Sequence, residues 1–381
     1  MSYEARLKQF EQDLAEVADL AFLPISADLQ YLTGVPRDMP NYGWSMHPGA
    51  WLEGLWLSPG RPAVLALPRM TAEFGGLGSQ QGVNIRVLGD HDDPAVMVSD
   101  ILEGLGVADA PRIATGDRTH AETLMGLQGL RPGAQFLSAT EVLRRQRVIK
   151  SEEEIAVMRR AGAITEAAFR DALPSFRHGM TELEVLSEVN FQLRRHGSLG
   201  ESFTSALYCS GPQHPMVMGD RLERMPRELQ PPVALLFDFG AILDGFCYDY
   251  GRTISFGQPT DEFRRIHELV MASQAAGIEA LQAGVHTTAQ TDAIARQVIE
   301  DGGYGEEFRH RLGHAIGMDV HEPPFLTASD QTLLQEGMLF TIEPSIMQLN
   351  DYSARVEDVV VARPGGGEKL TDGYQDLIVI D

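Results

Sequence analysis

The chain has 381 residues, of which 43% are hydrophobic, and its formal net charge is −23. This length and composition suffice for two domains with separate cores. The strong negative charge argues against binding to nucleic acid or to anionic membranes, because the field of the protein would repel phosphate groups. It does not identify a substrate.

Cysteine usage and the first residues bear on the cellular compartment. Only Cys209 and Cys247 occur, without a CxxC pattern, so a disulfide framework is not expected. The stretch at positions 1–17 is charged and has a helical pattern without an apolar signal core, and no segment approaches about 18 consecutive apolar residues. We therefore expect a cytoplasmic protein.

Residues 1–147 alternate between strand-like and helix-like segments. AVLAL at 63–67 and NIRVLG at 84–89 have the composition of strands, whereas the segments at 97–105 and 121–130 are typical of helices. This alternation predicts an α/β domain.

A second domain is expected at residues 148–381. It begins with a capping box, in which Ser151 and Glu154 are expected to satisfy each other's backbone donors at a helix start. Further along, residues 179–197 and 284–302 form a near-repeat, since each carries a threonine-started amphipathic helix between glycines. Helices of this kind are common, so the repeat is weak evidence for two related halves when taken alone.

Four acidic residues lie in or beside apolar stretches of this second domain. Asp238 interrupts VALLFDFG and Glu343 interrupts MLFTIEPS, both of which are typical of buried strands. Glu357 lies in the apolar run VEDVVVA, and Asp249 lies in GFCYDYGRTISF, where alternation predicts Cys247, Asp249, Gly251 and Thr253 on one face. Each close pair of carboxylates would repel by about 4 kcal/mol at 4 Å. Two divalent cations would convert this cost into binding energy.

A histidine motif adds a nitrogen ligand to these acids. His314 lies between Gly313 and Gly317, which allow close backbone approach, and His321 follows seven residues later. A single histidine in such a place is usually structural. In combination with four carboxylates, it indicates a two-metal hydrolytic centre.

The order and spacing of these motifs resemble the creatinase/prolidase family of pita-bread metallopeptidases. The resemblance rests on the pair Asp238 and Asp249, on GHAIGMDVHEPP, FTIEPS and RVEDVVV, and more weakly on YLTGV at 31–35. It covers residues 150–380 directly. It implies a creatinase-like α/β N-terminal domain and an α+β pita-bread catalytic domain, built from two pseudo-symmetric halves with the metals between them.

The resemblance also implies roles for individual residues. Asp238 would chelate one metal, His314 and Glu343 would hold the other, and Asp249 and Glu357 would bridge the two. The oxygen-rich ligand set suits Mn(II), with Co(II), Zn(II) or Fe(II) as alternatives. A metal-bridging hydroxide would be the nucleophile. As catalytic groups we expect Glu343 to transfer the water proton and His321 to stabilise the oxyanion.

Substrate-binding residues are less well defined by these motifs. We expect Arg355 and His321 to contact substrate. In the family a histidine usually ends the Ser-Gly…Pro-His stretch, but Met218 stands at that place, and His214 is the candidate replacement. Two further departures are Gly251 in place of a threonine and Ala315 in place of a second glycine.

The aromatic segment at 41–51 has two interpretations. It is either a packed domain edge or dimer contact, or a lid over the site of a neighbouring subunit in which Trp44 or His47 lines the substrate pocket. N-terminal domains of the family often provide such a lid.

The resemblance most simply implies a homodimeric, metal-dependent Xaa-Pro dipeptidase or related aminopeptidase that acts on short proline-containing peptides. The main alternative is a C–N hydrolase or a lyase acting on a small solute with the same scaffold. A catalytically silent binding module is a third possibility, although such a module would have no reason to keep all five ligands.

Overall fold

The computed structural model describes residues 2–37, 49–74, 82–218 and 221–380 of the chain. The described residues up to Arg147 form one compact unit, and those from Val148 onward form a second. The expected lid residues Trp44 and His47 lie outside the described residues. Among the described residues, no helix is both long enough and apolar enough to cross a membrane.

The first unit is built on a six-stranded mixed sheet with the order β4-β3-β2-β1-β5-β6. The segments predicted as strands form β3 and β4, and those predicted as helices form α4 and α5, so the α/β prediction is confirmed for them. The strands are β1 (Leu20–Pro24), β2 (Gly54–Leu57), β3 (Ala63–Pro68), β4 (Val83–Leu88), β5 (Arg112–Thr115) and β6 (Gln135–Ser138). The helices are α1 (Tyr3–Ala15), α2 (Ala27–Thr33), the 3-10 turn η1 (Ala50–Leu52), α3 (Arg69–Phe74), α4 (Pro94–Gly104), α5 (Ala121–Leu130) and α6 (Ala139–Arg147).

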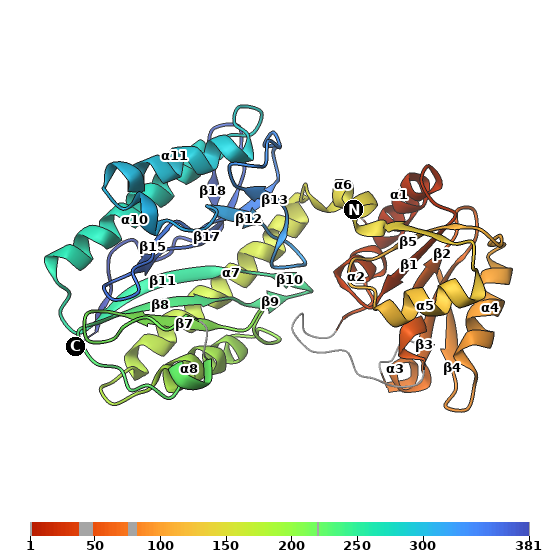
Figure 1. The fold of residues 1–381 in the computed structure, drawn as a ribbon, viewed down its shortest axis with the longest axis horizontal. Helices are drawn as coiled ribbons and strands as arrows, with labels where there is room; N and C mark the ends of the chain where they lie inside the picture. The colour runs from red at the N-terminus through yellow and green to blue at the C-terminus, as the bar shows by residue number, and fades with distance from the viewer. Residues whose placement is uncertain (1, 38–48, 75–81, 219–220, 381) are drawn as a thin grey trace. The chain divides into compact units, whose positions relative to one another are not determined.

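The second unit contains two helix pairs and two larger sheets (Figure 1). Its first half consists of α7 (Glu152–Ala172), η2 (Leu173–Ser175), α8 (Glu182–Arg195), β7 (Ala206–Ser210), α9 (Arg221–Arg224), β8 (Val233–Phe239), β9 (Ile242–Leu243), β10 (Phe246–Cys247) and β11 (Tyr250–Phe256). Its second half consists of α10 (Asp261–Ala280), α11 (Thr288–Asp301), η3 (Gly305–Glu307), β12 (Gly313–Ala315), β13 (Glu322–Leu326), β14 (Leu339–Ile342), β15 (Ser345–Ile346), β16 (Ala354–Arg355), β17 (Asp358–Val361), β18 (Glu368–Lys369) and β19 (Val379–Ile380).

The two halves repeat one pattern of a helix pair followed by a sheet. The first sheet has the order β19-β11-β8-β7 and the second has the order β13-β12-β14-β17-β18. Complete capping boxes start α7 at Ser151, α8 at Thr181 and α11 at Thr287. The near-repeat of the sequence therefore corresponds to α8 and α11, the second helices of the two pairs.

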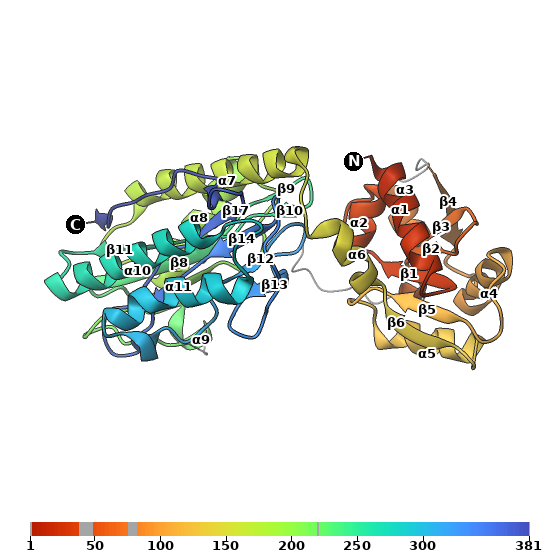
Figure 2. The same cartoon turned by 90° about the horizontal axis from the view of Figure 1, so that it is seen from above.

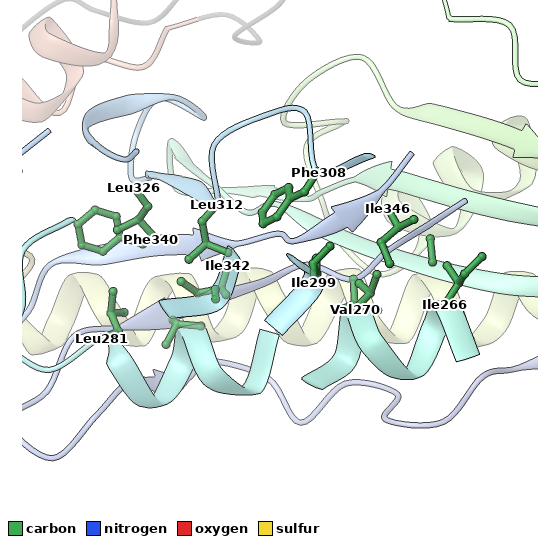
Figure 3. Packing of buried hydrophobic residues seen from close by; sticks show 14 of the residues in the cluster. Ile266, Val270, Leu281, Ile299, Phe308, Leu312, Leu326, Phe340, Ile342 and Ile346 are labelled. Atoms are coloured by element: carbon green, nitrogen blue, oxygen red, sulfur yellow. The ribbon is translucent and has the colours of Figure 1, made fainter. Parts of the chain in front are cut away.

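Apolar side chains fix the helices of the second half onto their sheet. α10 and α11 lie side by side (Figure 2), joined by a hydrogen bond from the Ser273 hydroxyl to the Ala295 carbonyl. Figure 3 shows Ile266 and Val270 of α10 packed in one cluster with Phe340 and Ile342 of β14. Burial of each such side chain contributes about 1.5–3 kcal/mol. This packing fixes β14, which ends one residue before Glu343.

Candidate metal centre

Alternation along β8 decides where Asp238 points. Phe237 and Phe239 lie on the helix side of the sheet, where their rings contact Phe169 of α7 at centroid distances of 5.2 and 5.7 Å. Asp238 therefore points to the opposite side. Its partner across the ladder on β11 is Gly251, which shares that face.

Asp249 directly precedes β11, one residue before Tyr250 pairs with Phe239. Gly251 and Thr253 lie on the Asp238 face, as alternation predicts. The prediction that Cys247 belongs to the same run was wrong, because Cys247 lies in the separate β9–β10 hairpin. Its thiol donates a hydrogen bond to the Met318 carbonyl at 3.3 Å.

The two glutamates come from neighbouring strands of the second sheet. Glu343 directly follows β14 and Glu357 directly precedes β17, and these strands pair so that Ile342 lies opposite Asp358. The antiparallel register brings both carboxylates to the same end of the strand pair.

His314 lies in β12, where close backbone packing requires its glycine neighbour. A Cβ atom at Gly313 would lie 1.9 Å from the Thr341 carbonyl oxygen, so no other residue fits without a shift of the strand. The Thr341 hydroxyl accepts a hydrogen bond from the His314 amide at 3.1 Å. The imidazole Nδ1 donates to the Ala315 carbonyl at 3.1 Å, which leaves Nε2 free to act as a ligand.

The five predicted ligands converge from both sheets. His314 Nε2 lies 3.6 Å from Asp249 Oδ2 and 3.5 Å from Glu343 Oε1. Ligand atoms of Asp249, His314 and Glu357 all lie within 4.8 Å of one another. Asp238 joins the group through Arg355, which contacts Asp238 at 2.8 Å and Glu343 at 3.7 Å.

The charges of this group are strongly perturbed. Burial raises the pKa of Asp238, and it raises the pKa of Glu343 to about 7. Burial, followed by repulsion among the carboxylates, raises the pKa values of Asp249 and Glu357 well above the ordinary range. Burial also lowers the pKa of His314 well below its usual value, so the imidazole is neutral.

The donor set fits divalent cations. Asp249 Oδ1 and Glu357 Oε2 are buried and make no hydrogen bond to the described part of the chain. Buried carboxylate oxygens without partners are costly, and a cation would both satisfy them and favour their charged form. Carboxylates with one neutral imidazole are a ligand set for Mn(II) and its neighbours.

The two other predicted catalytic or substrate-binding residues border this group. The ring of His321 is exposed and lies beside the ring of His314, with centroids 4.2 Å apart. Arg355 is largely buried against Asp238 and Glu343. His321 is thus placed at an open edge of the centre and Arg355 within it.

His310 is a residue of the centre that the sequence motifs did not reveal. Its Nδ1 donates to the Arg311 carbonyl at 2.7 Å, so we assign Nε2 as the acceptor. Nε2 faces the Ser345 hydroxyl at 2.5 Å and Arg355 Nη2 at 3.3 Å. The one available signal was the position of His310, four residues before His314.

His214 and Met218 are not placed among the predicted ligands. His214 lies near Glu182 of α8 and Cys209 of β7. Cys209 pairs with Leu235, so it is on the helix side of the sheet, opposite to Asp238. The side chain of Met218 is exposed.

Comparisons with known proteins agree with this geometry. Residues 156–364 match the model of metallopeptidase family M24. The putative dipeptidase YkvY of Bacillus subtilis is 32% identical over 94% of this chain and 95% of its own length. An Xaa-Pro dipeptidase of Lactobacillus helveticus is 29% identical over 98% of both chains. A solved dipeptidase from Pyrococcus horikoshii OT3 superposes with a TM-score of 0.85 at 29% identity, covering 98% of this chain and all of that one.

Proposed function

The chain belongs to metallopeptidase family M24, and from this premise we propose that it is an Xaa-Pro dipeptidase, which hydrolyses the bond preceding proline in short peptides. The family and its pita-bread fold, both expected from the sequence motifs, are confirmed. The substrate is proposed from the similarity to the Lactobacillus helveticus Xaa-Pro dipeptidase, which extends over nearly the whole chain.

The observation that carries this proposal is the convergence of Asp238, Asp249, His314, Glu343 and Glu357. These residues come from β8, β12 and the ends of β11, β14 and β17, so both halves of the unit contribute ligands. Orphaned oxygens on Asp249 and Glu357 are suited to bridging two cations. We propose a dinuclear centre in which these five residues hold two divalent ions, with Mn(II) favoured by the oxygen-rich donors.

Bound cations would supply an activated water and polarise the scissile carbonyl. The protein groups around the cations would transfer protons and balance charge. Glu343 would accept a proton from the attacking water and return it to the leaving nitrogen. Arg355 fixes Asp238 by a 2.8 Å ion pair.

His321 is suited to contact the substrate directly. Its ring is exposed beside His314, and burial together with Arg311 lowers its pKa. A neutral imidazole can donate one hydrogen bond to the carbonyl oxygen as negative charge develops there.

The test is hydrolysis of a panel of Xaa-Pro dipeptides by chelator-stripped protein reconstituted with Mn(II), Co(II) or Zn(II). The metal content per chain is measured on the same samples. We expect cleavage only after metal is restored, at close to two ions per chain. Matched dipeptides without proline serve as the specificity control.

Two outcomes would change the proposal. Binding of two ions without cleavage of any proline peptide would reject the peptidase activity and favour a small non-peptide substrate. Full cleavage by protein with one ion per chain would reject the dinuclear centre while leaving the peptidase activity in place.

A further inference from the structure

A second cluster of metal-ligand side chains lies on the helix side of the first sheet. It consists of Glu182, the first residue of α8, Cys209 of β7, and His214, which follows the turn after β7. Ligand atoms of the three residues all lie within 4.8 Å of one another. Because Asp238 points to the opposite side of the sheet, this cluster is separate from the five-residue centre.

The three side chains are deeply buried, and three of their polar atoms have no hydrogen-bond partner. Their exposed fractions are 0% for Glu182, 1% for Cys209 and 2% for His214. Both carboxylate oxygens of Glu182 and Nε2 of His214 make no hydrogen bond in the described structure. Buried polar groups are nearly always hydrogen-bonded, and exceptions indicate an ion or water that belongs there.

The spacing within the cluster is that of metal ligands. His214 Nε2 lies 3.5 Å from Glu182 Oε1, which exceeds the usual length of a hydrogen bond. Two ligands at about 2.1 Å from a tetrahedral ion lie about 3.4 Å apart. His314 shows the same spacing in the five-residue centre, at 3.5 Å to Glu343 and 3.6 Å to Asp249.

We propose that Glu182, Cys209 and His214 bind one divalent cation of the thiophilic or borderline class, such as Zn(II) or Co(II). A thiolate ligand favours these ions over Mn(II), which prefers oxygen. Binding exchanges the proton of the Cys209 thiol for the metal–sulfur bond, and the proton leaves to solvent without any redox change.

Arg227 and Arg224 both place positive charge near this cluster and so oppose a cation. Arg224 Nε lies 3.2 Å from Glu182 Oε2, and its guanidinium stacks on Tyr208 at 4.7 Å. Arg224 contacts the oxygen that faces away from His214, so Oε1 remains available to the ion. A divalent ion with one thiolate and one carboxylate is neutral, and Arg224 keeps its place against Oε2.

An ion at this place would cross-link three segments. It would join the start of α8 to the edge strand β7 and to the turn in which the His214 amide donates to the Gly211 carbonyl at 3.0 Å. We therefore assign a structural role to the ion, stabilising the edge of the sheet.

The test is a Co(II) titration of the chelator-stripped full-length protein, followed in the near ultraviolet. Thiolate-to-cobalt charge transfer absorbs there, and the five-residue centre contains no sulfur ligand. We expect a band whose final intensity corresponds to one thiolate-bound Co(II) per chain, which disappears in Cys209→Ser and persists in Cys247→Ser. Cys247 is the matched control, since it is also buried. Glu182→Gln is expected to weaken the cobalt affinity at least about tenfold.

The proposal is overturned if no such band forms in the wild type at any cobalt concentration that fills the five-residue centre. The cluster is then only a Glu182–Arg224 ion pair that braces α8. A band lost in Cys247→Ser and kept in Cys209→Ser also overturns it. If Cys209→Ser does not fold, His214→Ala gives the same assignment through loss of affinity. No substrate is used, so failure here is distinguishable from failure of the proposed peptidase activity.

Discussion

Gly251 and Glu357 exchange two backbone hydrogen bonds, from the Gly251 amide to the Glu357 carbonyl at 3.2 Å and from the Glu357 amide to the Gly251 carbonyl at 2.9 Å. This bridge joins the strand that follows Asp249 to the residue that precedes β17. It is the direct link between the two proposed bridging carboxylates, one from each half of the unit.

Gly251→Ala is expected to displace Glu357. A Cβ atom at position 251 would lie 2.9 Å from the Glu357 Cβ and 3.1 Å from its Oε2, so the carboxylate must move. We expect kcat/KM to fall about 10- to 100-fold, the usual effect of a small displacement at a reacting centre. Steady-state kinetics at saturating metal measure it. The control is Gly365→Ala, where a Cβ meets no atom within 4 Å; equal losses in both variants would contradict this explanation.

A buried ionic network behind the ligands is expected to be essential for stability. Asp358 pairs with Arg252 at 2.7 Å, and their side chains are 0% and 3% exposed. Arg252 also donates to the Gly251 and Glu357 carbonyls, while Gln274 links Asp358 to the Ile342 carbonyl. The network therefore joins the strands that carry Asp249, Glu343 and Glu357.

Asp358→Ala leaves the Arg252 charge buried without its partner. We expect the free energy of unfolding to fall by about 3–5 kcal/mol, measured by urea denaturation. The matched control is Arg160→Ala, because the Asp244–Arg160 pair is 62% and 61% exposed and such pairs contribute at most about 1 kcal/mol. If the two substitutions cost the same, the network is not a determinant of stability.

The sequence located the polar residues that converge in the candidate metal centre better than it located their surroundings. Asp238, Glu343 and His314 were identifiable because each is a polar residue inside an apolar or glycine-rich run, which is a local signal. The capping boxes at Ser151 and Thr181 are equally local.

The sequence carries no comparable local signal for contacts between residues that are far apart in the chain. Arg355 contacts Asp238 from 117 residues away, and His310 contacts Ser345 and Arg355 only because β15 and β16 pair. The position of His214 depends on the turn at Gly211 at the edge of the sheet, where strand alternation no longer specifies which way a side chain points.

His310 is expected to position Arg355 and to remain neutral while doing so. Burial, followed by the charge of Arg355, lowers the pKa of His310 to about 3. Its Nε2 can then accept from Arg355 and Ser345 across the working pH range. We expect His310→Ala to lower kcat about tenfold with metal content retained, and His310→Gln to recover part of the loss. The pH profile of kcat in both variants should keep the shape of the wild-type profile. Loss of its acidic or basic limb in a variant would make His310 a proton-transfer group instead.

In the metal-free protein, the free energy of unfolding is expected to fall as pH rises. In the metal-free protein burial raises the pKa of Glu343 from 4.5 to about 7, so the folded state binds a proton that the unfolded state releases above pH 4.5. The free energy of unfolding must then decrease as pH rises from about 4.5 through about 7, by up to about 1.4 kcal/mol per pH unit for each such group. The pKa values of Asp249 and Glu357 are also raised, so both groups act in the same direction.

Buried histidines act in the opposite direction at lower pH. The pKa of His267 is lowered to about 4, that of His310 to about 3 and that of His314 well below its usual value, in each case mainly by burial, so each adds stability as pH rises toward 6.5. The histidine contribution is common to stripped and metal-loaded protein, so the difference between the two isolates the carboxyl groups. Urea midpoints of both proteins between about pH 5 and 7 measure this difference. We expect stripped protein to lose stability relative to metal-loaded protein as pH rises, and parallel curves would contradict the perturbed carboxyl groups.

His321→Ala is expected to separate catalysis from metal binding. The ring lies 4.2 Å from that of His314, but it is exposed and contributes no ligand atom to the proposed set. Loss of a donor to the developing oxyanion lowers the rate about 10²-fold or more. We therefore expect kcat/KM to fall by that amount, with the metal content per chain unchanged and His321→Gln recovering part of the rate. Normal turnover of a metal-loaded His321→Ala protein would dismiss this role, whereas loss of metal would instead place His321 among the groups that hold His314 in position.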